Sequence, residues 1–259
     1  MIYYKTQDEI ELIRESSLLV AKALAEVAKI IRPGVSSLEL DKCAEEFIKD
    51  HQGVPAFKGY HGFPNSLCVS VNSEVVHGIP SKKPLIDGDI VSVDCGVLKN
   101  GFYGDSAYTF PVGEVDAKIL KLLRITKESL LLGIEKAIPG NRLGDIGHAI
   151  QEHAEKNGFS VVREMVGHGI GKQLHEKPEV PNYGKRGSGI LLKEGLVIAI
   201  EPMINFGKKN IRQGRDGWTI TTIDGLPSAH YEHTIAIGKE SSDVLSTFAY
   251  IDEVLQVAL

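Results

Sequence analysis

Two aspartates on a predicted β-hairpin are the first residues whose spacing could do chemistry. The segment DIVSVDCGVLKNGFYGDSAYTF (89–110) contains two β-like runs joined by Asn-Gly, a dipeptide typical of a type I′ turn. A two-residue turn places Asp105 opposite Gly96, which makes Asp94 its diagonal neighbour on the same face. Two covered carboxylates at this range are costly unless a cation or a shared proton lies between them. The spacing therefore predicts a metal site or an acid dyad; a turn-capping aspartate beside a solvated one is the alternative.

Two glutamates lie in equally apolar surroundings. Glu201 ends the run LVIAIEPM, and Glu232 stands inside the strand-like segment HYEHTIAI. Glutamate is poorly suited to strands and is seldom buried without a partner. Each glutamate alone is more simply explained as a solvated residue of an edge strand. Together with the two aspartates they form four carboxylates in strand contexts with no arginine nearby in sequence, and this set predicts a bound cation.

His168 supplies a candidate imidazole for the same site. It stands between two glycines in MVGHGIGKQLHE (165–176), where the backbone can approach closely. Clustered carboxylates with one imidazole are the ligand set of a dinuclear hydrolytic metal centre. A phosphate-binding glycine loop is the rival, but the Walker lysine pattern is missing, and no HExxH motif indicates a zincin. Spacing alone leaves His175 and His77 open between structural and catalytic roles.

The elements that must position these side chains occur twice along the chain. A helix, Pro-Gly, a second helix, a glycine and a strand appear in this order, with the helices expected at 8–31 and 36–52 and again at 115–138 and 142–157. The second copy leads into the expected strand FSVVREMV (159–166). The repeat favours a duplicated half-domain over coincidence. We expect one α+β catalytic domain, residues 1–259, with pseudo-symmetric halves of about 1–112 and 113–259 and an antiparallel sheet covered by helices on one side.

Composition excludes several classes of protein. The 259 residues are 42% hydrophobic and 24% charged with a net charge of −5, which is typical of a soluble globular protein and not of a general nucleic-acid binder. The N-terminal segment has no apolar signal region, and no window has the length of a membrane span. Three cysteines without CxxC spacing, Cys43, Cys68 and Cys95, indicate neither a disulfide framework nor a zinc finger. We expect a cytoplasmic protein with no membrane partner and no specific DNA partner.

The motifs as a whole resemble the type I methionine aminopeptidases in their short bacterial form, across nearly the whole chain. The matching segments are PNSLCVSVNSEVVHGIP, GDIVSVDCGVLKNGFYGDSAYTF, MVGHGIGKQLHEKPEVPNY, IAIEPM, DGWT and SAHYEHTIAI. The resemblance implies the duplicated "pita-bread" fold of the creatinase/aminopeptidase superfamily. In that fold a curved antiparallel sheet is flanked by helix pairs and carries a central dinuclear metal site. It also implies a monomer.

The resemblance assigns roles position by position. It implies that two divalent ions (Co, Mn, Fe or Zn) are bound by Asp94, Asp105, His168, Glu201 and Glu232, with Asp105 and Glu232 bridging them. The implied reaction removes the initiator methionine from nascent chains whose second residue is small, through attack by a metal-bridging hydroxide. The implied catalytic residues are Glu201 as general base and then acid, His175 as a donor to the oxyanion, and His77 as a contact to the scissile nitrogen.

A methionine pocket is also implied. Its expected wall consists of Tyr60, Phe63, Cys68, Met203 and Trp218. For Phe63 and Trp218, ordinary core packing is the interpretation that the sequence alone favours. Three further positions depart from the common bacterial pattern and bear on pocket size and rim polarity, namely Phe57, Leu174 and His230.

The partner and two rival functions complete the expectations. The basic segment FGKKNIRQGR (206–215) is read first as a solvated loop, and alternatively as a contact to ribosomal RNA, which would place the enzyme beside nascent N-termini. A proline-specific aminopeptidase or prolidase of the same fold is the first rival, although it usually carries a further N-terminal domain. A metal-free binding module is the second rival, and the presence of all five ligand positions argues against it.

Overall fold

The computed structural model describes residues 1–256, so the last three residues of the C-terminal stretch 241–259 lie outside the described part. Its α-helices are α1 (Gln7–Ile30), α2 (Ser37–Asp50), α3 (Ala117–Lys136), α4 (Leu143–Lys156) and α5 (Ala249–Leu255), and a short 3₁₀ turn, η1, spans Tyr60–Gly62. The strands are β1 (Val54–Pro55), β2 (Leu67–Val71), β3 (Glu74–Val76), β4 (Ile90–Lys99), β5 (Phe102–Pro111), β6 (Ser160–Val161), β7 (Gly167–Gly169), β8 (Glu176–Val180), β9 (Val197–Ile200), β10 (Met203–Asn205), β11 (Ile211–Gln213), β12 (Ile220–Thr222), β13 (Ser228–His230), β14 (His233–Ile237) and β15 (Ser242–Val244).

The two helix pairs confirm the predicted repeat. In each pair the first helix ends at a turn whose glycine has the left-handed backbone that L-residues avoid, with φ of 93° at Gly34 and 91° at Gly140. The start of α1 is fixed by Thr6, which accepts a hydrogen bond from the Glu9 amide while the Glu9 carboxylate bonds back to the Thr6 amide. Local caps and turns thus define both pairs.

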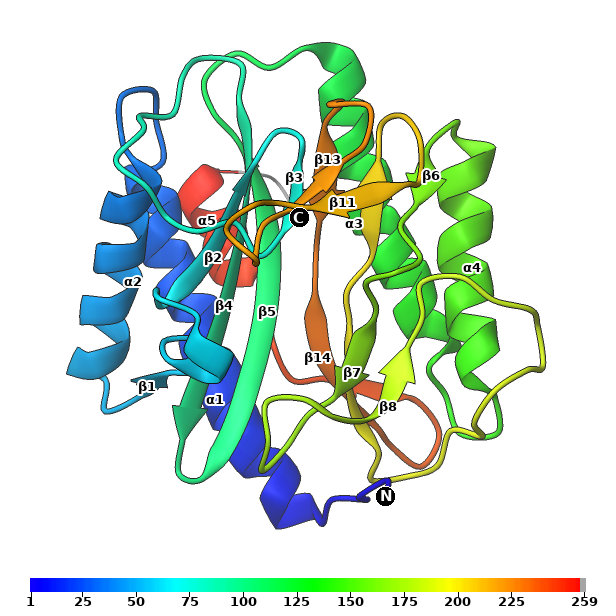
Figure 1. Ribbon diagram of the computed structural model, residues 1–259. Coiled ribbons are helices and arrows are strands. Elements are labelled where there is room, and N and C mark those ends of the chain that lie inside the picture. The colour runs from blue at the N-terminus through cyan, green and yellow to red at the C-terminus, as the bar shows by residue number, and fades with distance from the viewer. Residues whose placement is uncertain (257–259) are drawn as a thin grey trace.

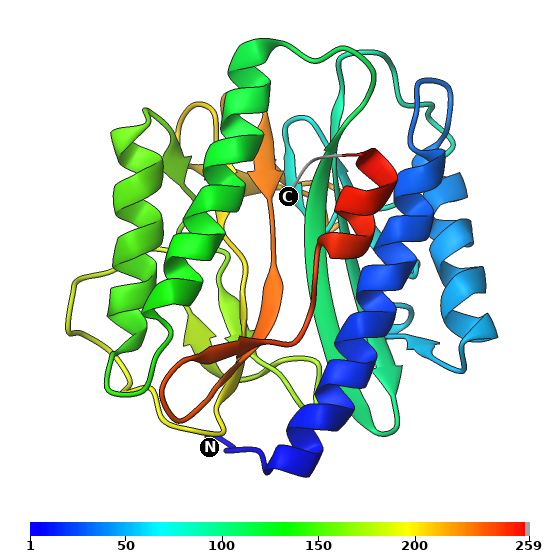
Figure 2. The same ribbon diagram turned by 180° about the vertical axis from the view of Figure 1, so that it is seen from behind.

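All strand pairing within the sheets is antiparallel, and the helices cover one side of them. The hydrogen-bonded orders are β1-β4-β2 with β5 on β4, β13-β10-β6, β11-β12-β3 and β15-β14-β9-β7-β8. Figure 1 shows the strands facing the viewer, and Figure 2, turned by 180°, shows α1, α3, α4 and α5 in front of them. The apolar stripe of α1 is buried, since Ile13, Val20, Leu24 and Val27 are fully inaccessible to solvent. The α+β expectation is confirmed.

The central hairpin β4–β5 has the register that the Asn-Gly turn predicts. Gly96 pairs with Asp105, and Asp94 pairs with Ala107. Asn100 and Gly101 have φ of 52° and 80°, as a type I′ turn requires. The two aspartates therefore lie on one face of the longest strand pair, as predicted.

Two local predictions are wrong. The expected strand 159–166 is confined to β6, after which the chain bends before it enters β7. The basic segment 206–215 is not a plain loop, because its residues Ile211–Gln213 form β11 and pair with β12. Both errors have the same cause: strand formation depends on a partner that is distant in sequence.

The C-terminal stretch completes the sheet and the helical layer. β15 pairs with β14 at one edge of the five-stranded sheet, and α5 packs beside α1 (Figure 2). Phe248, just before α5, stacks on the ring of His233 with 3.9 Å between ring centroids. Among the described helices, none combines the length and the hydropathy needed to cross a membrane.

Candidate metal centre

One cavity of about 430 Å³ gathers every site residue that the sequence singled out. Its wall includes the five predicted metal ligands, both predicted substrate histidines and all five predicted pocket residues, namely Asp94, Asp105, His168, Glu201, Glu232, His77, His175, Tyr60, Phe63, Cys68, Met203 and Trp218. The two halves of the chain both contribute, since the aspartates come from the β4–β5 hairpin and His168 from β7. Roles for these residues stay predictions; their convergence is a structural finding.

The ligand atoms converge on one point. Asp105, His168 and Glu232 are buried and offer ligand atoms that all lie within 4.8 Å of one another. Nε2 of His168 lies 3.9 Å from Oδ2 of Asp105 and 3.6 Å from Oε1 of Glu201. A carboxylate-rich group with one imidazole suits a divalent first-row metal ion.

The two glutamates lie in breaks between strands, as expected for Glu201 at the end of its apolar run but not for Glu232, which was predicted inside a strand. Glu201 follows β9 directly and precedes β10, while Glu232 lies between β13 and β14. β9 pairs with β14 in one sheet, and β10 pairs with β13 in another. The two segments that contain Glu201 and Glu232 therefore pass from one sheet to the other at the same place. Pro202, which has no N–H to donate, helps to interrupt the ladder. The break frees both carboxylates from the regular alternation of side chains between the two faces of a sheet, so that both can point into the cavity.

The glycines around His168 are required by close strand packing. A Cβ at Gly167 would overlap the carbonyl oxygen of Ala199, and one at Gly169 would overlap that of Lys177. His168 Nδ1 lies 2.9 Å from its neighbour's carbonyl oxygen, on Gly169. A carbonyl only accepts, so Nδ1 carries the proton and Nε2 presents its lone pair to the carboxylates. The backbone thus prepares His168 as an Nε2 ligand.

Several carboxylate oxygens in the cavity are buried without a hydrogen-bond partner within residues 1–256. These atoms are Oδ1 of Asp94, Oδ1 of Asp105 and Oε1 of Glu232. Burial raises the pKa of Asp94 to about 7 and that of Glu201 to about 8. Burial, followed by the charges of neighbouring carboxylates, raises the pKa values of Asp105 and Glu232 well above their usual range. A bound divalent ion would bind these unpaired oxygens and take the place of the protons that they would otherwise hold. The set of donor atoms therefore fits such an ion.

The two predicted substrate histidines face the same cavity as neutral rings. His77 follows β3 with a left-handed backbone, φ 58°, and burial lowers its pKa to about 4. His175 reaches solvent through the cavity mouth, but the surrounding protein removes enough hydration to lower its pKa to about 4. Its ring lies edge-on to His168 with centroids 4.3 Å apart. At neutral pH both rings can therefore donate one hydrogen bond each without carrying charge.

The apolar end of the cavity matches the expected pocket. Phe63 and Trp218 meet edge to face with centroids 5.2 Å apart, and both border the cavity, so they are more than core packing. Phe57 and Leu174, two of the three departures from the common bacterial pattern, are buried in its wall, whereas the third, His230, does not border the cavity. Gly96 leaves the space that the ring of Phe57 occupies, since a Cβ at this position would overlap the ring.

Sequence reasoning missed four further wall residues and one contact. His61, Val76, Met165 and Val166 also border the cavity, and each lies within three residues of a predicted site residue. His230 is fully buried, and its Nε2 lies 3.5 Å from Oε2 of Glu201. Adjacency along the chain could have indicated the four wall residues, whereas the His230 contact depends on the sheet change at Glu201.

The pKa shifts predict how the metal-free protein responds to pH. The buried carboxyls bind protons in the folded state up to about pH 8, whereas the unfolded chain releases them near pH 4. Rising pH through this range therefore favours unfolding. The buried histidines act oppositely, but only below their unfolded pKa of about 6.5. We expect the thermal midpoint of the metal-free protein to fall between about pH 6.5 and 8.

Differential scanning calorimetry at several pH values checks this expectation. With excess Mn²⁺ the fall should disappear, because the ion replaces the protons, and the gain on adding Mn²⁺ should be larger at pH 8 than at pH 6.5. A metal-free midpoint that rises over this range would contradict the assignment of protons to these carboxyls.

Comparison with known proteins places this geometry in context. Residues 11–239 match the model of metallopeptidase family M24. The chain is 51% identical over 246 residues to the methionine aminopeptidase of Clostridium perfringens and to methionine aminopeptidase 1 of Bacillus subtilis, covering 95% of this chain and 99% of each relative. The crystal structure of methionine aminopeptidase from Thermotoga maritima superposes with a TM-score of 0.94 at 47% identity, covering 95% of this chain and 100% of that one.

Proposed function

We propose that this chain cuts the first peptide bond of its substrates at a centre of two divalent metal ions in the cavity described above. The chain belongs to metallopeptidase family M24 and removes the initiator methionine of proteins. The observation that carries the proposal is the set of buried carboxylate oxygens around the Nε2 lone pair of His168 that have no hydrogen-bond partner within the described residues 1–256. Four carboxylates and one imidazole provide enough charge and enough ligand atoms for two ions.

In this proposal Asp105 and Glu232 would be shared by the two ions, Asp94 would help to hold one of them, and His168 with Glu201 would help to hold the other. The two halves of the chain act as one catalytic domain, because the aspartates belong to residues 1–112 and the other ligands to residues 113–259. The donor set accepts Mn, Fe, Co or Zn. When bound, such ions supply a nucleophilic hydroxide at neutral pH and polarise the carbonyl of the scissile bond.

The chain's own residues do the remaining work. Glu201 accepts a proton from the attacking water and then passes it to the leaving amine, so it acts first as general base and then as general acid. His175 donates a hydrogen bond to the oxygen on which negative charge develops, and His77 holds the scissile nitrogen. The free α-amine of the substrate lies at the carboxylate-rich end of the cavity, so that only the first peptide bond reaches these groups.

The methionine side chain occupies the apolar end of the cavity. Cys68 and Met203 add polarisable sulfur to the aromatic wall of Phe63 and Trp218, and this combination favours a flexible thioether. The preference for a small second residue follows the family resemblance. The chain acts as a cytoplasmic monomer in this proposal, and its three free cysteines suit a reducing compartment.

A peptide panel tests the substrate assignment. Met-Ala-Ser should release free methionine, whereas Ala-Ala-Ser should react at least about tenfold more slowly, because it forfeits about 2 kcal/mol of side-chain burial. An Ala-Pro peptide should not be cleaved faster than Met-Ala-Ser. A preference for Xaa-Pro substrates would overturn the proposal in favour of the prolidase alternative.

The ribosome contact stays a prediction about the basic β11 hairpin. Lys208, Lys209, Arg212 and Arg215 are all exposed, and such a cluster can bind the phosphate backbone of ribosomal RNA. Reversing all four to Glu should abolish salt-sensitive co-sedimentation with ribosomes and leave Met-Ala-Ser cleavage unchanged. If co-sedimentation survives the charge reversal, the basic segment is an exposed part of the surface that has no role in ribosome binding.

A further inference from the structure

The hydroxyl group of Tyr60 contacts the ring of His175 across 115 residues of sequence. Oη of Tyr60 lies 2.7 Å from Nδ1 of His175. Within the described residues, this is the one hydrogen bond that either group makes with another side chain or with the backbone. The sequence assigned Tyr60 to the pocket wall, and its ring does border the cavity, but the hydroxyl contact gives it a second use.

We propose that Tyr60 is a positioning residue that sets the tautomer and the orientation of His175. The inference rests on the proposed function, in which His175 donates a hydrogen bond to the substrate oxygen. A neutral imidazole has one N–H, so His175 can donate through Nε2 only if Nδ1 is the acceptor. The Tyr60 hydroxyl meets that requirement when it donates to Nδ1.

Chemistry favours this direction of the hydrogen bond. A phenol is a good donor and a weak acceptor, whereas the unprotonated nitrogen of a neutral imidazole is the more basic acceptor. The hydroxyl keeps its proton at neutral pH, because the ordinary pKa of a tyrosine is about 10 and burial raises that of Tyr60 further. The reverse arrangement would leave Nε2 as a lone pair facing the substrate, where it would repel the developing oxyanion.

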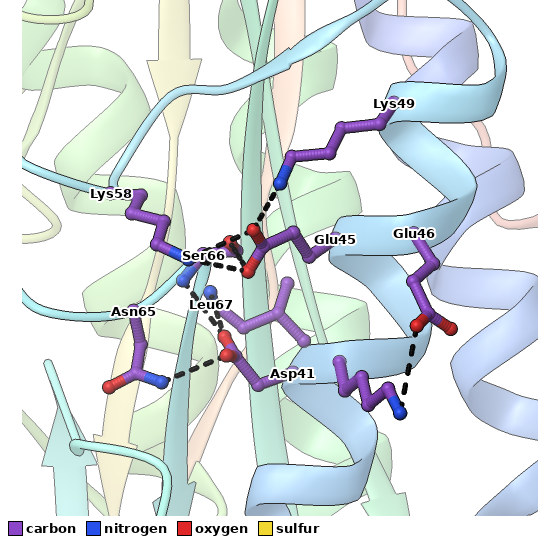
Figure 3. Close-up of polar contacts among 9 residues, drawn as sticks. Asp41, Glu45, Glu46, Lys49, Lys58, Asn65, Ser66 and Leu67 are labelled. Carbon is purple, nitrogen blue, oxygen red and sulfur yellow. Dashed lines mark hydrogen bonds and ion pairs between the residues drawn. The ribbon is translucent and has the colours of Figure 1, made fainter.

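Two carboxylates of α2 fix the loop that carries Tyr60 (Figure 3). Before the tyrosine, Lys58 Nζ lies 2.9 and 2.8 Å from the two oxygens of Glu45. After it, the backbone amides of Ser66 and Leu67 both donate to Oδ1 of Asp41 at 2.8 Å. Asp41 and Glu45 are four residues apart and so share one helix face, which holds both ends of the loop.

The turn itself leaves Tyr60 little freedom. Gly59 and Gly62 flank it with φ of 86° and 88°, values that favour glycine, and the amide of Gly62 donates back to the carbonyl of Gly59. The tyrosine ring is therefore presented from a short, hydrogen-bonded turn between two anchored ends.

The backbone beside His175 is held from the opposite side. Lys5 Nζ lies 2.6 Å from Oε2 of Glu176, and the two side chains are only 4% and 5% exposed. Oε1 of Glu176 accepts a hydrogen bond from the amide of Gln173. With the chain on both sides of His175 fixed, the rotation and the tautomer of the ring are what remain for Tyr60 to decide.

Tyr60→Phe tests the inference because it removes the hydroxyl and keeps the pocket wall. We expect kcat for Met-Ala-Ser to fall about ten- to hundredfold, with KM and the Mn²⁺ dissociation constant within about twofold of the parent. Tyr3→Phe is the matched control, since Tyr3 is 56% exposed and lies outside the site cavity. It should leave all three quantities unchanged.

The tautomer is observed directly by ¹⁵N NMR of the histidine-labelled, Zn²⁺-loaded protein, with the His175 signal identified by its loss in His175→Gln. The parent should show a protonated Nε2 and an unprotonated, hydrogen-bonded Nδ1, and Tyr60→Phe should lose the hydrogen-bonded Nδ1 signature. A protonated Nδ1 in the parent would overturn the inference, as would an unchanged kcat in Tyr60→Phe.

A double-mutant cycle separates this inference from the proposed function. If Tyr60 acts through His175, Tyr60→Phe should cost nothing further in a His175→Ala background. A full additional loss there would assign Tyr60 a separate role and overturn the inference while the proposed function stands. Failure of the parent to release methionine with any of the four metals would instead overturn the proposed function.

Discussion

Asp105→Asn should lower kcat/KM for methionine release from Met-Ala-Ser by at least about 10³-fold, equivalent to roughly 4 kcal/mol of lost transition-state stabilisation. Asp105 is only 3% exposed and shares the ligand cluster with His168 and Glu232. The amide keeps the size of the side chain but removes the negative charge that a bridging ligand supplies. The rate should be measured with Mn²⁺ in excess, and metal binding by isothermal titration calorimetry.

Two further measurements make the result specific. Asp8→Asn, at an exposed position in the first turn of α1, should leave the rate unchanged. The metal-free Asp105→Asn protein should be at least as stable as the metal-free parent, because it no longer buries an unpaired carboxyl. Near-parental activity of Asp105→Asn at equal metal occupancy would show that Asp105 does not hold the ions.

His175→Ala should lower kcat by about 10²- to 10³-fold, the effect typical of removing one donor to a developing oxyanion. His175 contacts the ring of His168 but offers no atom to the buried ligand cluster, so the affinity for Mn²⁺ should change little. Single-turnover kinetics with Met-Ala-Ser isolates the chemical step from product release.

The control and the contrary outcome follow from the same geometry. His51→Ala, at an exposed position just beyond α2, should leave kcat unchanged. If His175→Ala weakens Mn²⁺ binding in proportion to the loss of rate, His175 is a ligand and not an oxyanion donor.

The features predicted best from sequence are those fixed by short-range rules. The Asn-Gly turn alone defines the register of β4 and β5, and so the shared face of Asp94 and Asp105. The helix pairs and their Pro-Gly turns follow from apolar periodicity and from glycines that need left-handed backbone. The turn dipeptides and the apolar periodicity are both local signals, because each lies in or next to the element that it specifies.

The features predicted poorly depend on partners far along the chain. Glu232 was expected inside a strand, but β9 ends where β14 begins, and the chain that continues beyond this point in each case pairs in another sheet. No local pattern marks that change. The contacts of Tyr60 with His175 and of His230 with Glu201 likewise require the assembled fold, because each joins residues brought together by different sheets and loops. For the roles of both substrate histidines, the family resemblance supplied what residue spacing left open.

The central claim is that the cavity works as a two-metal centre, and metal add-back to the metal-free protein tests it most directly. Metal-free protein should be titrated under anaerobic conditions with Mn²⁺, and in parallel with Fe²⁺, Co²⁺ and Zn²⁺, while methionine release from Met-Ala-Ser and bound metal are both measured. We predict no release without metal, recovery with at least one of the four ions, and saturation of binding at two ions per chain with Asp105→Asn unable to recover. Undiminished release by the metal-free protein, or the absence of any divalent metal binding, would contradict the account.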